Sequence, residues 1–346
     1  MILEIKKRLD SQISAYIRNL EKSYALAKIS PLLYTSIKNF ISRKGKRIRP
    51  IMFIIGYLGF AKKAAPGLYR SAISLELLHD FILVHDDIID KSPLRRGKPS
   101  MHEMLNGYLK EYKNIKFNGQ DLAIMAGDVI YAMALDTYLS VKEDSRRKEL
   151  ALKKFIHTAL CTGGGEFAEL LYGAKGLNEI KKEDIYKIYD LKTANYTFAA
   201  PLCMGATLAG ARKQTLAKIS GTGICLGRAF QIKDDIIGLF EKKNTTGKSN
   251  ITDVQEAKKT ILIWHAYKNS GNKDRAKIEV IFSKKIVCNS DLPVIRDIVT
   301  TTGTLEYAKK EISTLLDRAG HPEALSGMRP EYRDSLLTYS KEMLLI

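Results

Sequence analysis

Apolar residues recur at spacings of three and four along almost the whole chain, which is the pattern of amphipathic α-helices. The clearest examples are Ile2, Ile5, Leu9, Leu75, Leu78, Ile82, Ile89, Ile224, Phe230 and Ile236. No sustained alternation of valine and threonine with polar residues indicates a sheet. No proline lies between Pro201 and Pro293, and a long proline-free run also favours helices. The sequence therefore predicts an all-α fold of roughly ten or more helices.

Length and composition favour one large domain over residues 1–346. Hydrophobic residues make up 45% of the 346 positions, so the chain can bury a sizeable core. The breaks in the helical pattern are short and are typical of turns between helices. No internal repeat or low-complexity linker divides the chain.

The charge balance favours anionic partners. Lysine and arginine number 56 against 38 aspartate and glutamate, a formal net charge of +18. Such an excess suits nucleic acid, a membrane surface or phosphorylated metabolites, or it is simply a lysine-rich solvated surface. The charge alone does not distinguish between these possible partners and a solvated surface.

Several features predict a reduced, cytoplasmic setting. The N-terminal stretch MILEIKKRLDSQISAYIRNLEK carries charges every few residues, which indicates an amphipathic helix rather than a signal peptide. Residues 193–211 hold no charge but include Asn195 and Pro201, so they predict a buried helix, kinked or broken near Pro201, rather than a membrane span. The cysteines form no CxxC pair, which argues against zinc and disulfides. They are Cys161, Cys203, Cys225 and Cys288.

The stretch HDDIIDKSPLRRGKPS, which begins at His85, places acids directly before arginines. Asp86 and Asp90 are four apart, so a helix puts both carboxylates on one face, about 5.4 Å apart along the axis. Asp87 adds a third acid. Like charges at this spacing repel, and a hard divalent cation such as Mg²⁺, which takes carboxylate and phosphate oxygens, would neutralise them. The alternative is a solvated helix end.

A second acidic pair occurs in GRAFQIKDDIIGLF, where Asp234 and Asp235 follow an apolar helical stretch and Gln231 lies one turn before Asp235. Either pair alone is a weak signal. Together they predict opposite walls of one cavity.

Basic residues match these acids. KGKRIRP contributes Lys44, Lys46, Arg47 and Arg49, and RRG contributes Arg95 and Arg96. Arginine holds phosphate oxygens with two nitrogens, and lysine acts as a point charge. A nucleic-acid patch is the alternative, but acids facing the ligand would repel a nucleic-acid backbone.

The motifs KGKRIRP, HDDIIDKSPLRRGKPS, LKTANYTFAAP, FQIKDDIIG and TGK, in this order, resemble those of the trans-prenyltransferases, or polyprenyl diphosphate synthases, most of all the short-chain geranylgeranyl diphosphate synthases. The resemblance runs from about Lys44 to Lys258, and TTGTLEYAKKEI (301–312) extends it. It implies the isoprenoid synthase fold, a helical bundle around a central cavity, and a homodimer. The implied reaction is Mg²⁺-dependent, head-to-tail condensation of isopentenyl diphosphate with dimethylallyl, geranyl or farnesyl diphosphate.

The resemblance also implies roles for particular residues. Asp86, Asp90 and Asp234 would bind three Mg²⁺ ions. Arg95 would join these ions on the allylic diphosphate. Isopentenyl diphosphate would be held by Lys46, Arg49, His79 and Arg96. The departing diphosphate and the nascent cation would face Lys192, Thr193 and Gln231, and further diphosphate ligands would be Lys248 and Lys258.

The growing product would run along the helix that precedes the first aspartate motif. A helical wheel from Asp86 selects Ile82 and Leu78 as wall residues one and two turns earlier. The family resemblance instead points to Phe81, the fifth residue before the motif. An aromatic residue there resembles synthases that stop at twenty carbons, with farnesyl diphosphate or a mixture as the alternative.

Two segments depart from the family pattern at particular residues. Gly238 stands where many members have the last acid of the second motif, and Glu166 and Glu169 stand in a segment that is usually Gly-Gln-x-x-Asp. The stretch before Lys258 is also one residue longer than usual, which loosens that assignment.

Three other readings compete. A non-catalytic subunit of a heteromeric synthase typically lacks an aspartate motif, whereas both are present here. A terpene cyclase needs no isopentenyl diphosphate site, and KGKRIR with RRG argues against it. A nucleic-acid-binding module is motivated only by the charge, so we expect no nucleic-acid partner. Peripheral contact with an anionic membrane stands as a hypothesis for the basic surface.

Overall fold

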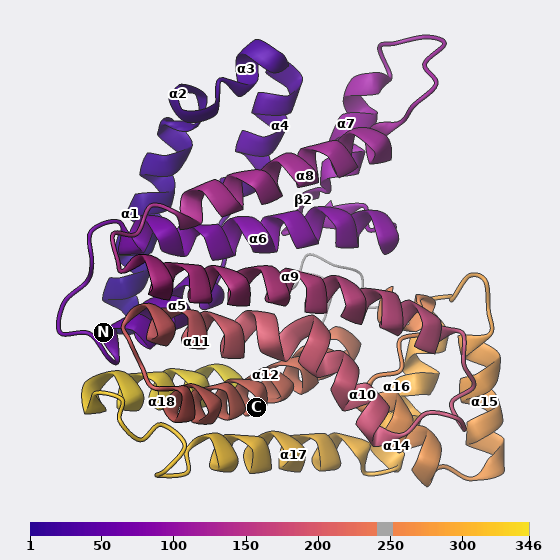
Figure 1. Ribbon diagram of the computed structural model, residues 1–346. Helices are drawn as coiled ribbons and strands as arrows, with labels where there is room; N and C mark the ends of the chain where they lie inside the picture. The colour runs from indigo at the N-terminus through magenta and orange to yellow at the C-terminus, as the bar shows by residue number, and fades with distance from the viewer. Residues whose placement is uncertain (241–251, 346) are drawn as a thin grey trace.

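The computed structural model describes residues 1–240 and 252–345 (Figure 1). The N-terminal half contains the helices α1 Ile2–Arg18, α2 Leu20–Tyr24, α3 Leu26–Ile29, α4 Pro31–Ile41, α5 Ile48–Leu58, α6 Leu68–Ile89, α7 Met101–Leu109, α8 Gly119–Tyr138 and α9 Ser145–Gly173. The C-terminal half contains α10 Lys182–Tyr189, the π-helix η1 Asp190–Ala199, α11 Ala200–Leu208, α12 Lys213–Phe240, α13 Thr252–Gln255, α14 Ile261–Asn269, α15 Asn272–Phe282, α16 Asp291–Thr301, α17 Thr304–Ala319 and α18 Pro330–Leu344. The predicted all-α class is confirmed.

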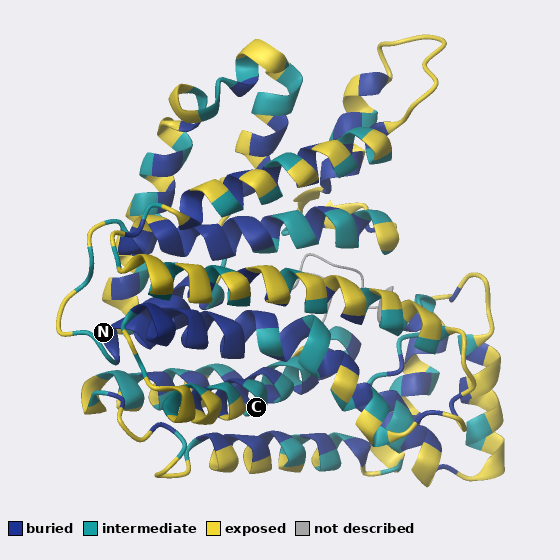
Figure 2. Cartoon of the chain, in the orientation of Figure 1, coloured by how far each residue is buried: buried dark blue, intermediate teal, exposed yellow. Residues whose placement is uncertain are grey.

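The centre of the bundle is a pair of helices, α5 and α11, that are buried almost all round (Figure 2). Neither helix carries a charge on its buried residues, so both fit only in the interior. Two glycines let them touch. A Cβ on Gly56 would lie 2.2 Å from the Leu202 carbonyl oxygen, and one on Gly205 would lie 2.1 Å from that of Phe53.

Amphipathic helices surround this pair. α6 packs on α8 and on α5, α12 packs on η1 and α17, and α9 packs on α11 and η1. α9 alternates buried and exposed positions along its length (Figure 2). The buried apolar side chains form one contiguous cluster. Within the described residues, no helix is long and apolar enough to cross a membrane.

Two local features carry the polar motifs. The uncharged segment beginning at Thr193 is a buried helix, as predicted, and its geometry changes from π to α at Ala200, next to Pro201. π-Helical turns are uncommon and often occur at functional sites. The second feature is a short hairpin of β1 Leu94–Arg95 and β2 Lys98–Pro99, which periodicity did not predict. Its turn uses positive φ at Arg96 and Gly97.

Candidate active site

The three aspartates near the end of α6 differ in burial and in hydrogen-bond partners. Asp87 is fully buried and accepts hydrogen bonds from Nε of Arg95, at 2.8 Å, and from its Nη2. Asp86 is half-buried on another face of the helix. Asp90 is the C-cap residue of α6, and Nζ of Lys258 lies 3.6 Å from its Oδ2. One aspartate thus anchors the hairpin, and the other two remain as candidate ligands.

The pair on α12 divides in the same way. Asp235 is buried and accepts hydrogen bonds from the Tyr189 hydroxyl and, at 2.9 Å, from Nε2 of Gln231. The Thr193 hydroxyl donates to Oε1 of Gln231 at 2.6 Å. Asp234 is exposed. The chain Thr193–Gln231–Asp235–Tyr189 therefore fixes the π-helix against α12 and orients two of the predicted catalytic side chains.

Lys192 is held by the two glutamates that depart from the family pattern. Its Nζ lies 2.5 Å from a carboxylate oxygen of Glu166 and 2.5 Å from one of Glu169. Burial tends to lower the pKa of Lys192, but Glu169, Asp86 and Glu166 outweigh it, so the pKa is raised. Burial raises the pKa of Glu166 to about 7. The negative charge of Asp86 contributes to the raised pKa of both Lys192 and Glu166.

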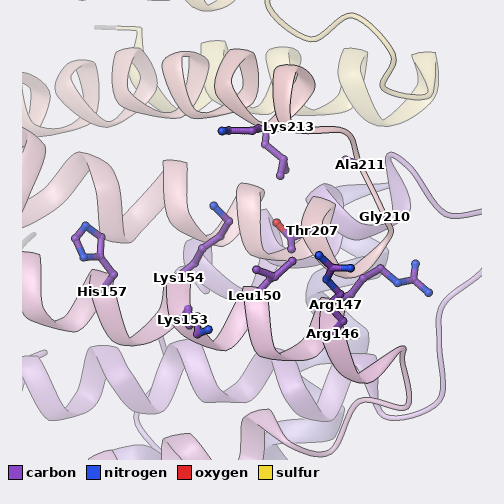
Figure 3. A pocket seen from close by; sticks show the side chains of 11 residues that line it. Arg146, Arg147, Leu150, Lys153, Lys154, His157, Thr207, Gly210, Ala211 and Lys213 are labelled. Carbon is purple, nitrogen blue, oxygen red and sulfur yellow. The ribbon is translucent and has the colours of Figure 1, made fainter.

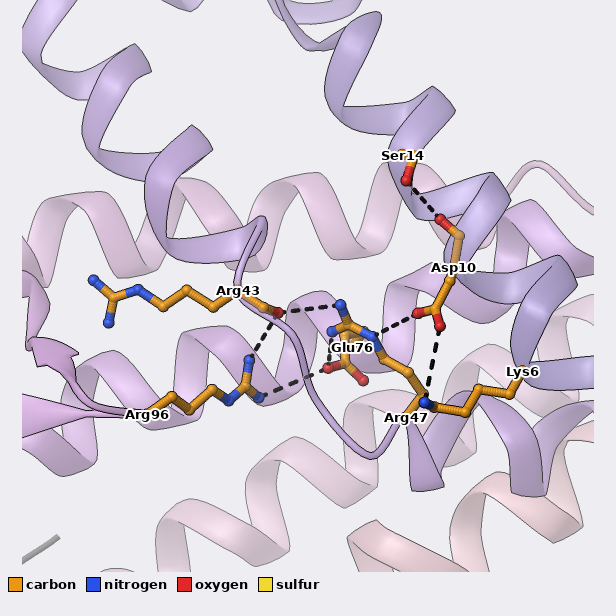
Figure 4. Close-up of polar contacts among 7 residues, drawn as sticks. All are labelled: Lys6, Asp10, Ser14, Arg43, Arg47, Glu76 and Arg96. Atoms are coloured by element: carbon orange, nitrogen blue, oxygen red, sulfur yellow. Dashed lines mark hydrogen bonds and ion pairs between the residues drawn. The ribbon is translucent and has the colours of Figure 1, made fainter. Parts of the chain in front are cut away.

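Within the predicted basic motif KGKRIRP, Arg47 is bound by carboxylates of the protein itself (Figure 4). Arg47 has a positive φ of 57° and is buried, with Nε 3.3 Å from Asp10 and Nη1 2.5 Å from Glu76. Its Nη2 donates to the Arg43 carbonyl, and Nη1 of Arg96 donates to the same oxygen at 3.3 Å. Arg96 also lies 3.8 Å from Glu76. Glu76 therefore positions two guanidinium groups.

Three predicted binding residues meet at two aromatic rings. The Arg49 guanidinium lies 4.0 Å above the Tyr196 ring, and Nζ of Lys46 lies 5.8 Å from the Phe230 ring. The Tyr196 hydroxyl is hydrogen-bonded to Nδ1 of His79 at 2.9 Å. Burial, followed by the charge of Arg49, holds the pKa of His79 well below its usual value. The ring is therefore neutral near pH 7.

Lys258 lies beside two carboxylates near the end of α6. Its Nζ lies 2.7 Å from Glu256 as well as near Asp90. Burial raises the pKa of Glu256 to about 7. Lys248, the other predicted diphosphate ligand of this region, lies outside the described residues.

The three predicted chain-length residues take different positions on α6. Leu78 is fully buried, and Ile82 is half-buried. The Phe81 ring turns to α8, with ring centroids 4.9 Å from Tyr131 and 4.6 Å from His85.

Sequence reasoning missed several supporting residues of the site. Tyr196 lies four residues after Lys192, a spacing that could have placed both on one side of a helix. Glu76 lies in an apolar run with no local signal. Asp80 is buried, its Oδ1 has no hydrogen-bond partner among the described residues, and burial raises its pKa to about 8.

The carboxylates suit Mg²⁺. Asp86, Asp90 and Asp234 offer only hard oxygen donors, and Mg²⁺ commonly takes one or two carboxylates while water and phosphate complete its shell. In the described part of the chain, no three acidic, histidine or cysteine side chains gather into a ready-made metal site. The donor set therefore fits an ion that arrives with a phosphate ligand. A set of acidic residues that bind metal ions and a set of basic residues can together hold two phosphorylated molecules.

Known proteins resemble this chain over most of its length. Residues 30–299 match the family model described as polyprenyl synthetase. The chain is 30% identical over 291 residues to geranylgeranyl diphosphate synthase of Sulfolobus acidocaldarius, covering 80% of this chain and 83% of that one. It is 30% identical over 289 residues to geranylfarnesyl diphosphate synthase of Aeropyrum pernix, covering 81% and 83%.

Solved structures share the fold. The crystal structure of geranylgeranyl pyrophosphate synthase from Corynebacterium glutamicum, complexed with isoprenyl diphosphate and magnesium, matches with a TM-score of 0.87 and 24% identity, covering 99% of this chain and 98% of that one. Geranylgeranyl pyrophosphate synthetase from Pyrococcus horikoshii matches with a TM-score of 0.79 and 25% identity, covering 99% and 96%.

Proposed function

Since the chain belongs to the polyprenyl synthetase family, we propose that it condenses isopentenyl diphosphate with allylic diphosphates and releases geranylgeranyl diphosphate. The chain is a prenyltransferase of the short-chain trans type, as its sequence predicts. The observation that carries the proposal is that η1 is hydrogen-bonded to both helices that carry the aspartate motifs, through Thr193 to Gln231 on α12 and through Tyr196 to His79 on α6. The basic residues Lys46 and Arg49 lie against the rings of Phe230 on α12 and Tyr196 on η1.

The allylic diphosphate binds on the acidic side of the cavity, next to Asp86, Asp90 and Asp234, with three Mg²⁺ ions. Bound Mg²⁺ supplies positive charge that stabilises the departing diphosphate. Lys192, held by two glutamates, and Lys258 add fixed cations in the same region, so little reorganisation is needed as the carbon–oxygen bond breaks.

Isopentenyl diphosphate binds on the basic side, with Lys46, Arg49 and Arg96 around its diphosphate. Neutral His79 donates or accepts a hydrogen bond without adding charge. Because both substrates are bound side by side, the attack of the isopentenyl double bond on the allylic cation is effectively intramolecular. A new carbon–carbon bond forms, and the departed diphosphate accepts the proton that is lost. The Thr193 and Gln231 oxygens lie beside the cation, and the apolar wall keeps water from quenching it.

A product assay tests this proposal. The purified chain would be incubated with labelled isopentenyl diphosphate and each allylic primer, with Mg²⁺ or with EDTA, and the products would be sized. We expect Mg²⁺-dependent twenty-carbon product, lost in Asp234→Asn. Absence of product with every primer would favour the non-catalytic subunit and refute the proposal.

The same assay tests the stop at Phe81. Phe81→Ala removes the ring that packs on Tyr131, so we expect products longer by one or more five-carbon units. The control is Phe117→Ala, an exposed aromatic residue that leaves the product unchanged. A wild-type product of twenty-five carbons, as the Aeropyrum relative's name states for that protein, would keep the enzyme but discard Phe81 as the stop.

We also propose a homodimer. α9 exposes large apolar side chains at helical spacing, and the exposed fractions are 46% for Ile156, 68% for Leu160, 67% for Phe167 and 58% for Leu171. A Cβ on Gly163 or Gly164, between them, would meet nothing within 4 Å. Contiguous exposed apolar surface of this kind commonly marks a protein–protein contact.

The four free cysteines support a cytoplasmic setting.

A further inference from the structure

A second groove lies between the first half of α9, the end of α11 and the start of α12 (Figure 3). Its volume is about 700 Å³, which is within the usual range for small-molecule sites. Lys213 in this groove and Asp234 of the candidate active site are both on α12. Their separation along the helix is about 30 Å. The groove is therefore distinct from the site around Asp234.

The rim of the groove is basic. Its cationic residues are Arg146, Arg147, Lys153, Lys154 and Lys213, with His157 beside them. Two of the cations are neutralised, because Arg147 lies 2.9 Å from Glu143 and Lys153 lies 2.5 Å from Glu149. Among the described residues, no carboxylate lies within ion-pair distance of Arg146, Lys154 or Lys213. Three cations thus face one space without a counter-charge.

The interior of the groove is apolar. Leu150 and Leu216 line its floor, and an adjoining hollow of about 440 Å³ shares Lys154 and Lys213. That hollow continues over Ala200 and Cys203. Figure 3 shows Lys154 on α9 and Lys213 at the start of α12 on opposite sides of the same space. The positive charge of Lys154 reaches inward, since it lowers the pKa of the Cys203 thiol against the larger upward effect of burial.

We infer that this groove binds a phosphate ester carried on a hydrocarbon chain. Lysine and arginine take phosphate oxygens as charge-assisted hydrogen bonds, and the apolar floor takes the chain. A free phosphate would leave the floor unused, and a neutral lipid would leave three cations unpaired. The ligand is either a soluble prenyl diphosphate or the headgroup of an anionic phospholipid at a membrane surface. The site goes beyond the proposed reaction, whose residues it does not share.

The test compares Lys154→Gln/Lys213→Gln with the control Lys62→Gln/Lys63→Gln, which removes the same charge from an exposed loop. Farnesyl diphosphate would be titrated calorimetrically in EDTA without isopentenyl diphosphate, so that no turnover occurs. Sedimentation with phosphatidylcholine vesicles, with and without phosphatidylglycerol, would test the membrane source.

We expect the groove variant to lose one farnesyl diphosphate site per chain, or to bind phosphatidylglycerol vesicles at least about 10-fold more weakly, while the control binds as wild type does. The first result identifies a soluble ligand, and the second a membrane. Unchanged binding in the groove variant, or an equal loss in both variants, overturns the inference. Synthase activity stays at the wild-type level in both variants, so failure of the proposed reaction would be seen separately.

Discussion

His79 illustrates how one residue acquires its role from its surroundings. The sequence shows only a histidine before an aspartate motif. The structure places it against the Tyr196 hydroxyl and near Arg49, where a protonated imidazole would lack water and face a second cation. It therefore acts as a neutral hydrogen-bonding group, and its role in binding isopentenyl diphosphate stays a prediction.

The pH dependence of stability tests this environment. Because the folded pKa of His79 lies below the unfolded value of 6.5, the unfolded chain binds the extra proton as pH falls. His79 therefore costs stability below pH 6.5, by up to about 1.4 kcal/mol per pH unit. We expect His79→Gln to flatten the fall in unfolding free energy between pH 6.5 and 5.5, measured by denaturant titration. His321→Gln, at an exposed position, is the control. Equal slopes in all three proteins would contradict the prediction.

At the scale of elements, the contact between α5 and α11 positions the site. η1 runs directly into α11, so any displacement of α11 from α5 moves Lys192 and Thr193. The contact depends on backbone approaching backbone at Gly205, where no side chain can move aside. The sequence pattern predicted that the segment containing α11 is buried, but it contained no sign that this segment contacts α5.

Gly205→Ala tests this contact. Its Cβ would meet the Phe53 carbonyl oxygen at 2.1 Å, so the helices must separate, and we expect a loss of about 3 kcal/mol in unfolding free energy. Gly221→Ala is the control, because a Cβ there meets nothing within 4 Å and alanine favours a helix interior by about 0.5–1 kcal/mol. A Gly205→Ala protein as stable as wild type would show that the two helices have room to spare.

At the scale of the whole molecule, charge and exposed apolar surface are distributed unevenly. The chain has a formal charge of +18, and the exposed apolar side chains of α9 lie at helical spacing on one face. A net charge this far from zero makes copies of the chain repel one another. A specific apolar contact therefore has to carry the proposed dimer.

Light scattering after size-exclusion chromatography tests that contact. Leu160→Glu/Phe167→Glu places two carboxylates on the exposed face of α9, and we expect a dimer in the wild type and a monomer in this variant. Leu3→Glu/Ile29→Glu is the control, because these side chains are 75% and 74% exposed and belong to α1 and α3. A monomeric wild-type protein, or a variant that remains a dimer, would refute the proposed surface.

The sequence by itself determined the helical class and the family, and these predictions are confirmed. They follow from local information, because helical periodicity and motif order are written along the chain. The sequence also predicted one site for Lys192, Thr193 and Gln231. In the structure, Lys192 and Thr193 are adjacent on η1 and the Thr193 hydroxyl is hydrogen-bonded to Gln231. Their catalytic roles stay predictions.

Only the tertiary structure decided which member of each aspartate pair is an anchor. Asp87 and Asp235 are buried on Arg95 and Tyr189, whereas Asp86 and Asp234 are not. The family resemblance selected Asp86 and Asp234 as ligands, but only the packing shows what their neighbours do. The same holds for Glu166 and Glu169, whose carboxylates turn out to hold Lys192. Such roles depend on burial and on partners far away in the chain, which are set only when the helices pack.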